Sequence, residues 1–107
     1  MTPDQWATIG RLVGWLDTAN GTSEQERAMR LIKLTEEAGE VSQAYVGMVG
    51  QNPRKGVTHT AADVADELCD VIVTAAVALH SFTDDPAGTL AAKLETIAVR
   101  SLTTART

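Results

Sequence analysis

Apolar residues recur at intervals of three and four along most of the chain, which is the spacing of one face of an α-helix. Stripes of this kind comprise Trp6, Ile9, Leu12, Val13 and Leu16, and further along Leu31, Leu34, Ala38, Val41, Tyr45 and Met48. No segment shows the sustained alternation of apolar and polar residues that is typical of a half-buried strand. The pattern therefore predicts an all-α fold, a bundle of four helices.

Capping residues and helix breakers set the ends of the first two helices. The first is expected over residues 3–19, because Asn20-Gly21 breaks the pattern, and the second is expected to end near residues 47–50. The residues that form their start signals are Thr2, Pro3 and Gln5 for the first helix, and Thr22 or Ser23 with Gln25 or Glu26 for the second.

A loop over residues 51–56, rich in Pro, Gly and Asn, separates the second helix from the third. The third is capped by Thr58 or Thr60 and continues to about His80. A fourth begins at Pro86 after Asp85, and its apolar residues Leu90, Leu94 and Ile97 are expected to face inward. We interpret residues 1–102 as a single domain and residues 103–107 as a flexible tail.

The third helix is apolar around most of its circumference, so it is expected to be largely buried, with Cys69 as a small buried side chain. The second helix places Glu37 only about 60° from the centre of its apolar stripe, next to Lys33 and Glu40. The polar row that remains on the third helix comprises Asp63, Glu67, Asp70 and Thr74. Acidic groups beside a core repel one another and lose hydration, so a positive group is expected between them.

That positive group is either a basic side chain or a metal ion. Arg30, Lys33 and Lys55 are the available side chains, but a hard divalent cation suits clustered carboxylate oxygens better. The simpler alternative is that the acids are solvated surface residues, as acidic pairs at this spacing usually are.

Length, charge and cysteine content exclude or disfavour several classes of protein. The chain has 107 residues, a net charge of -5 and one cysteine, which disfavours binding to a nucleic-acid duplex and excludes an internal disulfide. No run of apolar residues is long enough to span a bilayer, and no signal peptide is recognisable at the N-terminus. A cytoplasmic protein with no membrane association is expected. Trp15 lies off the first apolar stripe, which makes it a candidate platform for a base or a subunit contact.

The segments Lys33–Glu40 (KLTEEAGE) and Asp66–Val71 (DELCDV) resemble the EExxE and ExxD signature of the MazG-like, all-α nucleoside triphosphate pyrophosphohydrolases. The resemblance implies hydrolysis of a nucleoside triphosphate to the monophosphate and pyrophosphate, as in the house-cleaning of noncanonical or deoxynucleotides. It also implies a homodimer or homotetramer.

Residue by residue, the resemblance makes Glu37, Glu40, Glu67 and Asp70 the ligands of Mg²⁺, with Mn²⁺ as the other candidate ion. It makes Glu36 an accessory catalytic carboxylate. The candidate substrate-binding residues are Lys33, Lys55, Lys93 and Arg100.

The fourth helix departs from the family pattern, because Ile97 stands where family members carry an asparagine that helps to bind the nucleotide. Two alternatives therefore stay open beside the enzyme. One is a regulatory module that binds nucleotides with little turnover, and the other is a structural helical oligomerisation domain.

Overall fold

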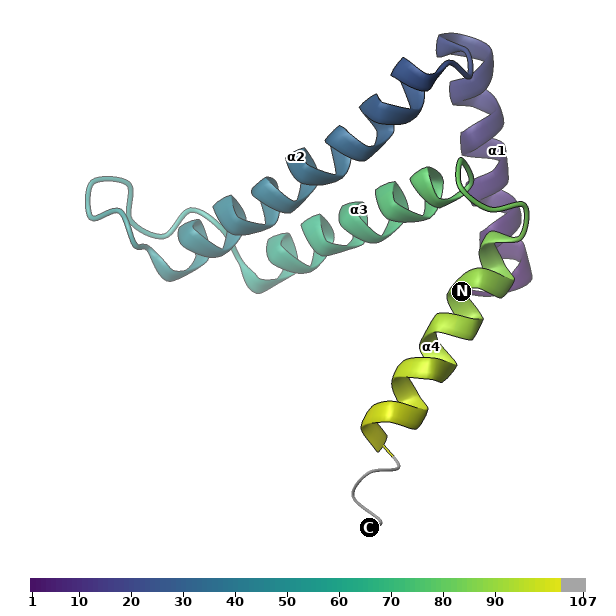
Figure 1. Cartoon of the computed structure of the whole chain (residues 1–107). Coiled ribbons are helices and arrows are strands. Elements are labelled where there is room, and N and C mark those ends of the chain that lie inside the picture. The colour runs from purple at the N-terminus through teal and green to yellow at the C-terminus, as the bar shows by residue number, and fades with distance from the viewer. Residues whose placement is uncertain (103–107) are drawn as a thin grey trace.

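The computed structural model describes residues 1–102 as four α-helices (Figure 1). They are α1 (Pro3–Asn20), α2 (Glu24–Val49), α3 (Ala61–Leu79) and α4 (Pro86–Leu102). This described part of the chain contains no β-strand. The prediction of an all-α protein with four helices is confirmed, whereas the predicted tail, residues 103–107, lies outside the described residues.

Local capping explains where the helices begin. The Thr2 hydroxyl accepts a hydrogen bond from the backbone N–H of Gln5, and the Gln5 side chain accepts one from the backbone N–H of Thr2. These reciprocal bonds satisfy two N–H groups that a helix start leaves free. Of the alternatives left open by the sequence, Ser23 is the cap of α2 and Thr60 is the cap of α3.

The loop between α2 and α3 folds back closely onto the end of α2. The backbone N–H of Thr58 donates to the carbonyl of Gly47 at 2.9 Å. A Cβ atom at Gly47 would lie 2.2 Å from Nδ1 of His59, so only glycine permits this approach. The return of the chain at this point places α3 antiparallel to α2.

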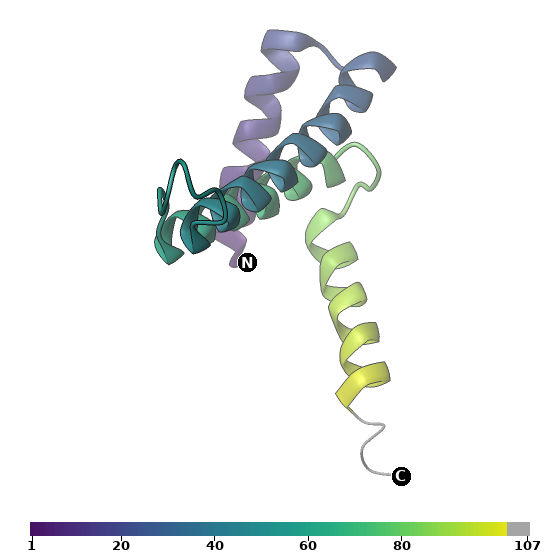
Figure 2. The same cartoon turned by 90° about the vertical axis from the view of Figure 1, so that its left-hand side faces the viewer.

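Helices α2 and α3 lie side by side over most of their length, and α1 crosses the C-terminal half of α3 (Figure 1). Ile9 of α1 packs with Ala76 and Val77 of α3, and three half-buried residues, Trp6, Val13 and Leu16, complete this small core. Helix α4 begins near the end of α3 and runs away from the other helices in both views (Figures 1 and 2). The core cluster therefore lies between α1 and α3, Ala44 is the buried apolar residue of α2, and α4 has no buried residue.

Two expectations about burial are wrong for the single chain. Helix α3 is not largely buried, because Ile72 is 57% exposed and Cys69 is exposed as well. The residues of α4 that were expected to face inward are also uncovered, with exposed fractions of 44% for Leu90, 64% for Leu94 and 38% for Ile97. Periodicity correctly identifies the apolar side of each helix, but nothing in it specifies whether the same chain covers that side.

Within residues 1–102, no helix is both long and apolar enough to cross a membrane.

Candidate metal centre

Four carboxylates from two helices converge at the middle of the α2–α3 pair. Glu37 and Glu40 lie one turn apart on α2, and Glu67 and Asp70 lie one turn apart on α3. Each offers one oxygen atom, and these four oxygens all lie within 4.8 Å of one another. We refer to Glu37, Glu40, Glu67 and Asp70 as the acid cluster; its geometry can hold a metal ion.

Two oxygens of the acid cluster are buried and unsatisfied. Glu37 is only 8% exposed and Glu67 is half-buried, whereas Glu40 and Asp70 are exposed. The Oε2 atoms of Glu37 and Glu67 have no hydrogen-bond partner among the described residues. A buried carboxylate oxygen without a partner carries a substantial free-energy cost, which a bound cation removes. The donor set, four carboxylates, also fits the oxygen preference of Mg²⁺.

Lys33 supplies part of the compensating charge. Its Nζ lies 3.0 Å from Oε1 of Glu37, one helical turn away, and the side chain of Lys33 is 60% exposed. The hydrogen bond and charge of Glu37 raise the pKa of Lys33 above its ordinary value, so this ammonium group is fully charged at neutral pH. One lysine faces four carboxylates, and the balance of charge in the acid cluster stays negative.

Glu67 is the member of the acid cluster whose pKa is shifted by burial and by this excess of negative charge. Burial against α2 raises the pKa of Glu67, and the neighbouring carboxylate of Glu40 raises it further, with smaller contributions from Asp70 and Asp66. The raised pKa means that ionised Glu67 is destabilised when no cation is present. The site is therefore arranged to gain from a proton or a metal ion at this position.

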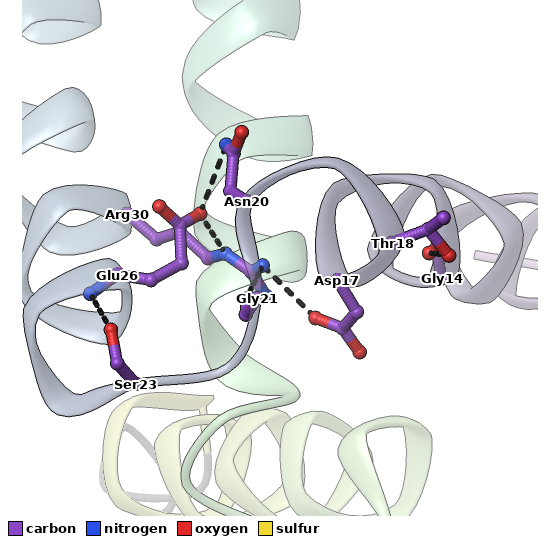
Figure 3. Close-up of polar contacts among 8 residues, drawn as sticks. All are labelled: Gly14, Asp17, Thr18, Asn20, Gly21, Ser23, Glu26 and Arg30. Atoms are coloured by element: carbon purple, nitrogen blue, oxygen red, sulfur yellow. Dashed lines mark hydrogen bonds and ion pairs between the residues drawn. The ribbon is translucent and has the colours of Figure 1, made fainter.

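Arg30 is not available to neutralise the acid cluster. The guanidinium group of this buried residue contacts Asp17 Oδ1 at 2.9 Å and Glu26 Oε2 at 2.9 Å, and it donates to the carbonyl of Gly21 at 3.4 Å (Figure 3). These contacts join the end of α1 to the start of α2. The sequence-based suggestion that Arg30 is a partner of the acids is wrong, because its charge is already matched at this junction.

The other predicted site residues, Glu36, Lys55, Lys93 and Arg100, are not members of the acid cluster. Glu36 is exposed and does not belong to the four converging carboxylates. Lys55 is an exposed residue of the α2–α3 loop and lines a pocket of about 470 Å³ with Gln43 and His59. Lys93 and Arg100 lie on α4, which runs away from the α2–α3 pair (Figures 1 and 2).

An apolar pocket adjoins the acid cluster on the side of α1. Trp15, which is 66% exposed, lines this pocket of about 210 Å³ together with Leu12 and Val73. Lys33 also lines it, and the same side chain binds Glu37. The sequence singled out Trp15 but not the pocket, because its walls come from three helices and no short spacing in the chain unites them.

Comparisons with known proteins give no relative for this chain: no protein-family model, no curated protein and no solved structure matches it.

Proposed function

We propose that the chain is a magnesium-dependent nucleotide pyrophosphohydrolase, which converts a nucleoside triphosphate to the monophosphate and pyrophosphate. The observation that carries the proposal is the convergence of Glu37, Glu40, Glu67 and Asp70, with two buried oxygens that lack a partner. The choice of reaction rests on the resemblance of the two acidic segments to the MazG-like signature. Mn²⁺ is the second ion that the donor set suits.

In this proposal the acid cluster holds the ion. When bound, Mg²⁺ neutralises charge on the polyphosphate and polarises the phosphorus that is attacked. Glu36 is exposed next to Glu37 and acts as the accessory carboxylate that orients the attacking water and accepts its proton. Lys33 holds Oε1 of Glu37, and this contact fixes the direction in which the other oxygen points.

The nucleotide then has two further contacts within one chain. The apolar pocket beside Trp15 takes the base, because an exposed indole offers a stacking surface next to Lys33 and the acids. Lys55 takes a phosphate from the loop side. Lys93 and Arg100 lie on a helix that runs away from the acid cluster, so their contact with a phosphate comes from another copy in a homodimer or homotetramer.

Product analysis tests the reaction. Incubation with a panel of nucleoside triphosphates and Mg²⁺ is expected to release monophosphate and pyrophosphate in equal amounts, and Mn²⁺ is expected to replace Mg²⁺. Glu67→Gln is expected to lower kcat by at least about a hundredfold, since it removes a ligand of the ion. Glu95→Gln, which changes an exposed acid on α4, is the matched control. Diphosphate and orthophosphate as products would contradict the proposal.

One observation favours a second candidate, a regulatory module that binds nucleotides without efficient turnover. Ile97 supplies an apolar side chain on α4 where the MazG-like pattern has an amide. Equilibrium dialysis separates the two candidates, because the regulatory module binds a nucleoside triphosphate with Mg²⁺ and returns it unchanged.

A further inference from the structure

The apolar pocket beside Trp15, here called the Trp15 pocket, lies one helical turn beyond the acid cluster. Lys33 stands four residues before Glu37 on α2, and Thr74 stands four residues after Asp70 on α3. Since the two helices run antiparallel, both steps lead to the same end of the cluster, about 6 Å along the helix axes (Figure 1). Lys33 and Thr74 both line the pocket. A ligand whose charged part is held at the acid cluster therefore places its uncharged part here.

Apolar and aromatic side chains form most of the Trp15 pocket. Its volume is about 210 Å³, and five such residues line it. They are Leu12, Trp15 and Leu16 of α1, and Val73 and Val77 of α3. A planar ring that enters between these side chains loses contact with water. Each polar group on the buried edge of the ring then needs a hydrogen-bond partner from the protein.

Two polar residues that line the pocket are already engaged. The guanidinium group of Arg30 contacts carboxylates of α1 and α2, and the ammonium group of Lys33 contacts Glu37 (Figure 3). Both side chains contain donors only, and the indole of Trp15 also contains only a donor. These groups serve a carbonyl oxygen or a ring nitrogen of a bound base. None of them serves an amino group, which requires an acceptor.

Thr74 is the remaining polar residue of the pocket. It is half-buried, and among the described residues that line the pocket it has the only side chain with a hydrogen-bond acceptor. A threonine within a helix often donates its hydroxyl group to the carbonyl one turn back, as Thr8, Thr18 and Thr96 do at 3.0 to 3.2 Å. Thr74 forms no such bond within residues 1–102. Its hydroxyl group is left for a molecule in the pocket.

We propose that Thr74 is a specificity-determining residue, whose Oγ1 accepts a hydrogen bond from an exocyclic amino group of a nucleobase stacked on Trp15. A valine has the same shape and would complete the apolar wall with Val73 and Val77, but it would leave that amino group unpaired. The inference rests on the proposed function, because the acid cluster and its ion hold the phosphates that bring the base to the pocket. It adds the class of substrate: a nucleotide whose base carries an amino group.

Titration with pairs of nucleoside monophosphates tests this assignment. Monophosphates are products of the proposed reaction and are not hydrolysed by it, so their dissociation constants are measured directly with Mg²⁺ present. One pair is adenosine and purine riboside monophosphate, and the other is cytidine and pyrimidin-2-one riboside monophosphate. The second member of each pair has hydrogen in place of the amino group. In at least one pair, the parent is expected to bind the amino-bearing member at least about tenfold more tightly.

Substitution of Thr74 shows whether this preference comes from its hydroxyl group. Thr74→Val is expected to weaken binding of the preferred amino-bearing nucleotide at least about tenfold and to change binding of its partner by no more than about twofold. Thr74→Ser retains a hydroxyl group and is expected to keep the preference. Thr35→Val makes the same change at an exposed threonine of α2 that does not line the pocket, and it is expected to leave both constants unchanged.

Release of pyrophosphate from the corresponding triphosphates separates this inference from the proposed function, and circular dichroism establishes whether each variant is helical. The same ratios are expected in kcat/KM. A parent that releases pyrophosphate without preferring an amino-bearing base, or a helical Thr74→Val variant that keeps the preference, overturns the role of Thr74 and leaves the proposed function standing. A parent that neither binds these nucleotides nor releases pyrophosphate overturns both.

Discussion

Glu37 is the residue whose position is hardest to explain without a ligand. Its carboxylate is buried, one oxygen is held by Lys33, and the other has no partner among residues 1–102. A protein that needed only stability at this position would be better served by an apolar side chain. Helical spacing alone placed Glu37 next to Glu40, and Glu67 and Asp70 in one polar row with Asp63, because spacing along a helix is a local property. The resemblance to the MazG-like signature selected the four residues that converge in the structure.

Neutralising Glu67 tests whether the carboxylates of the acid cluster destabilise the metal-free protein, and the test needs only measurements of stability. Glu67→Gln removes one of several like charges, and its raised pKa shows that the charged form is disfavoured in the folded protein. In the presence of a chelator, the variant is expected to unfold at the same temperature as the parent or higher. Mg²⁺ well above its dissociation constant is expected to stabilise the parent by on the order of 1 to 3 kcal/mol and to have little effect on the variant.

Thermal unfolding of both proteins, with chelator and with Mg²⁺, provides the measurement. Glu95→Gln removes an exposed acid from α4 and is expected to keep the full magnesium response. A parent whose unfolding temperature is the same with and without Mg²⁺ would exclude the metal site.

Helical spacing did not predict the contacts of Arg30 with the preceding helix. The sequence offers it as a neighbour of the acids, but its real partners include Asp17 on the preceding helix, which no helical periodicity connects to it. Arg30→Ala is expected to lower the free energy of unfolding by about 2 to 4 kcal/mol, because Glu26 and Asp17 lose their common partner. Denaturant unfolding measures the loss. Arg11→Ala is the control, since this exposed arginine forms no ion pair within the described residues. A loss for Arg30→Ala no larger than that of the control would contradict this role.

At the scale of the elements, the starts of the helices could be predicted because capping residues mark them in the sequence. Thr2, Ser23 and Thr60 each accept the hydrogen bond that an N-cap is expected to accept. The closure of the loop onto α2 was not predictable, since the fit of Gly47 against His59 depends on where the returning chain lies. The pocket beside Trp15 could not be predicted either, because its lining residues come from three helices.

The cap of α3 gives a prediction with a defined pH dependence. The backbone N–H of Thr60 donates to Asp63 Oδ2 at 2.8 Å and its hydroxyl donates at 3.1 Å, and these bonds hold the pKa of Asp63 below its ordinary value. Because the folded pKa is the lower one, this contribution to stability is present above the unfolded pKa and is lost as the pH falls through the folded pKa. Thr60→Ala is therefore expected to cost about 1 kcal/mol at neutral pH and less in acid.

Denaturant unfolding at a series of pH values measures this difference. Thr35→Ala is a suitable control, because Thr35 is also exposed but lies on α2 and caps no helix. A cost for Thr60→Ala that stays constant down to the acid limb would show that the bond to Asp63 contributes nothing.

At the scale of the whole molecule, the four helices of one chain do not cover all of their own apolar stripes, because α4 runs away from the other three (Figures 1 and 2). Helical periodicity requires every apolar stripe to be covered, and it is satisfied equally by the same chain or by another one. The chain has too few buried residues of its own, since Ile9, Ala44, Ala76, Val77 and Ala78 are the only buried apolar residues within residues 1–102. Helices α1 to α3 alone therefore give a small core, and stability is expected to depend on association.

Dependence on association makes the unfolding temperature a function of protein concentration. When folding and dimerisation are coupled, mass action favours the native dimer as the chain is concentrated. With an enthalpy of about 0.7 kcal/mol per residue for both chains, a hundredfold increase in concentration is expected to raise Tm by roughly 5 to 8 °C. Differential scanning calorimetry over that range is the measurement. A chain that folds as a monomer melts at one temperature at every concentration, and that outcome would mean that α1, α2 and α3 form a sufficient core without a partner.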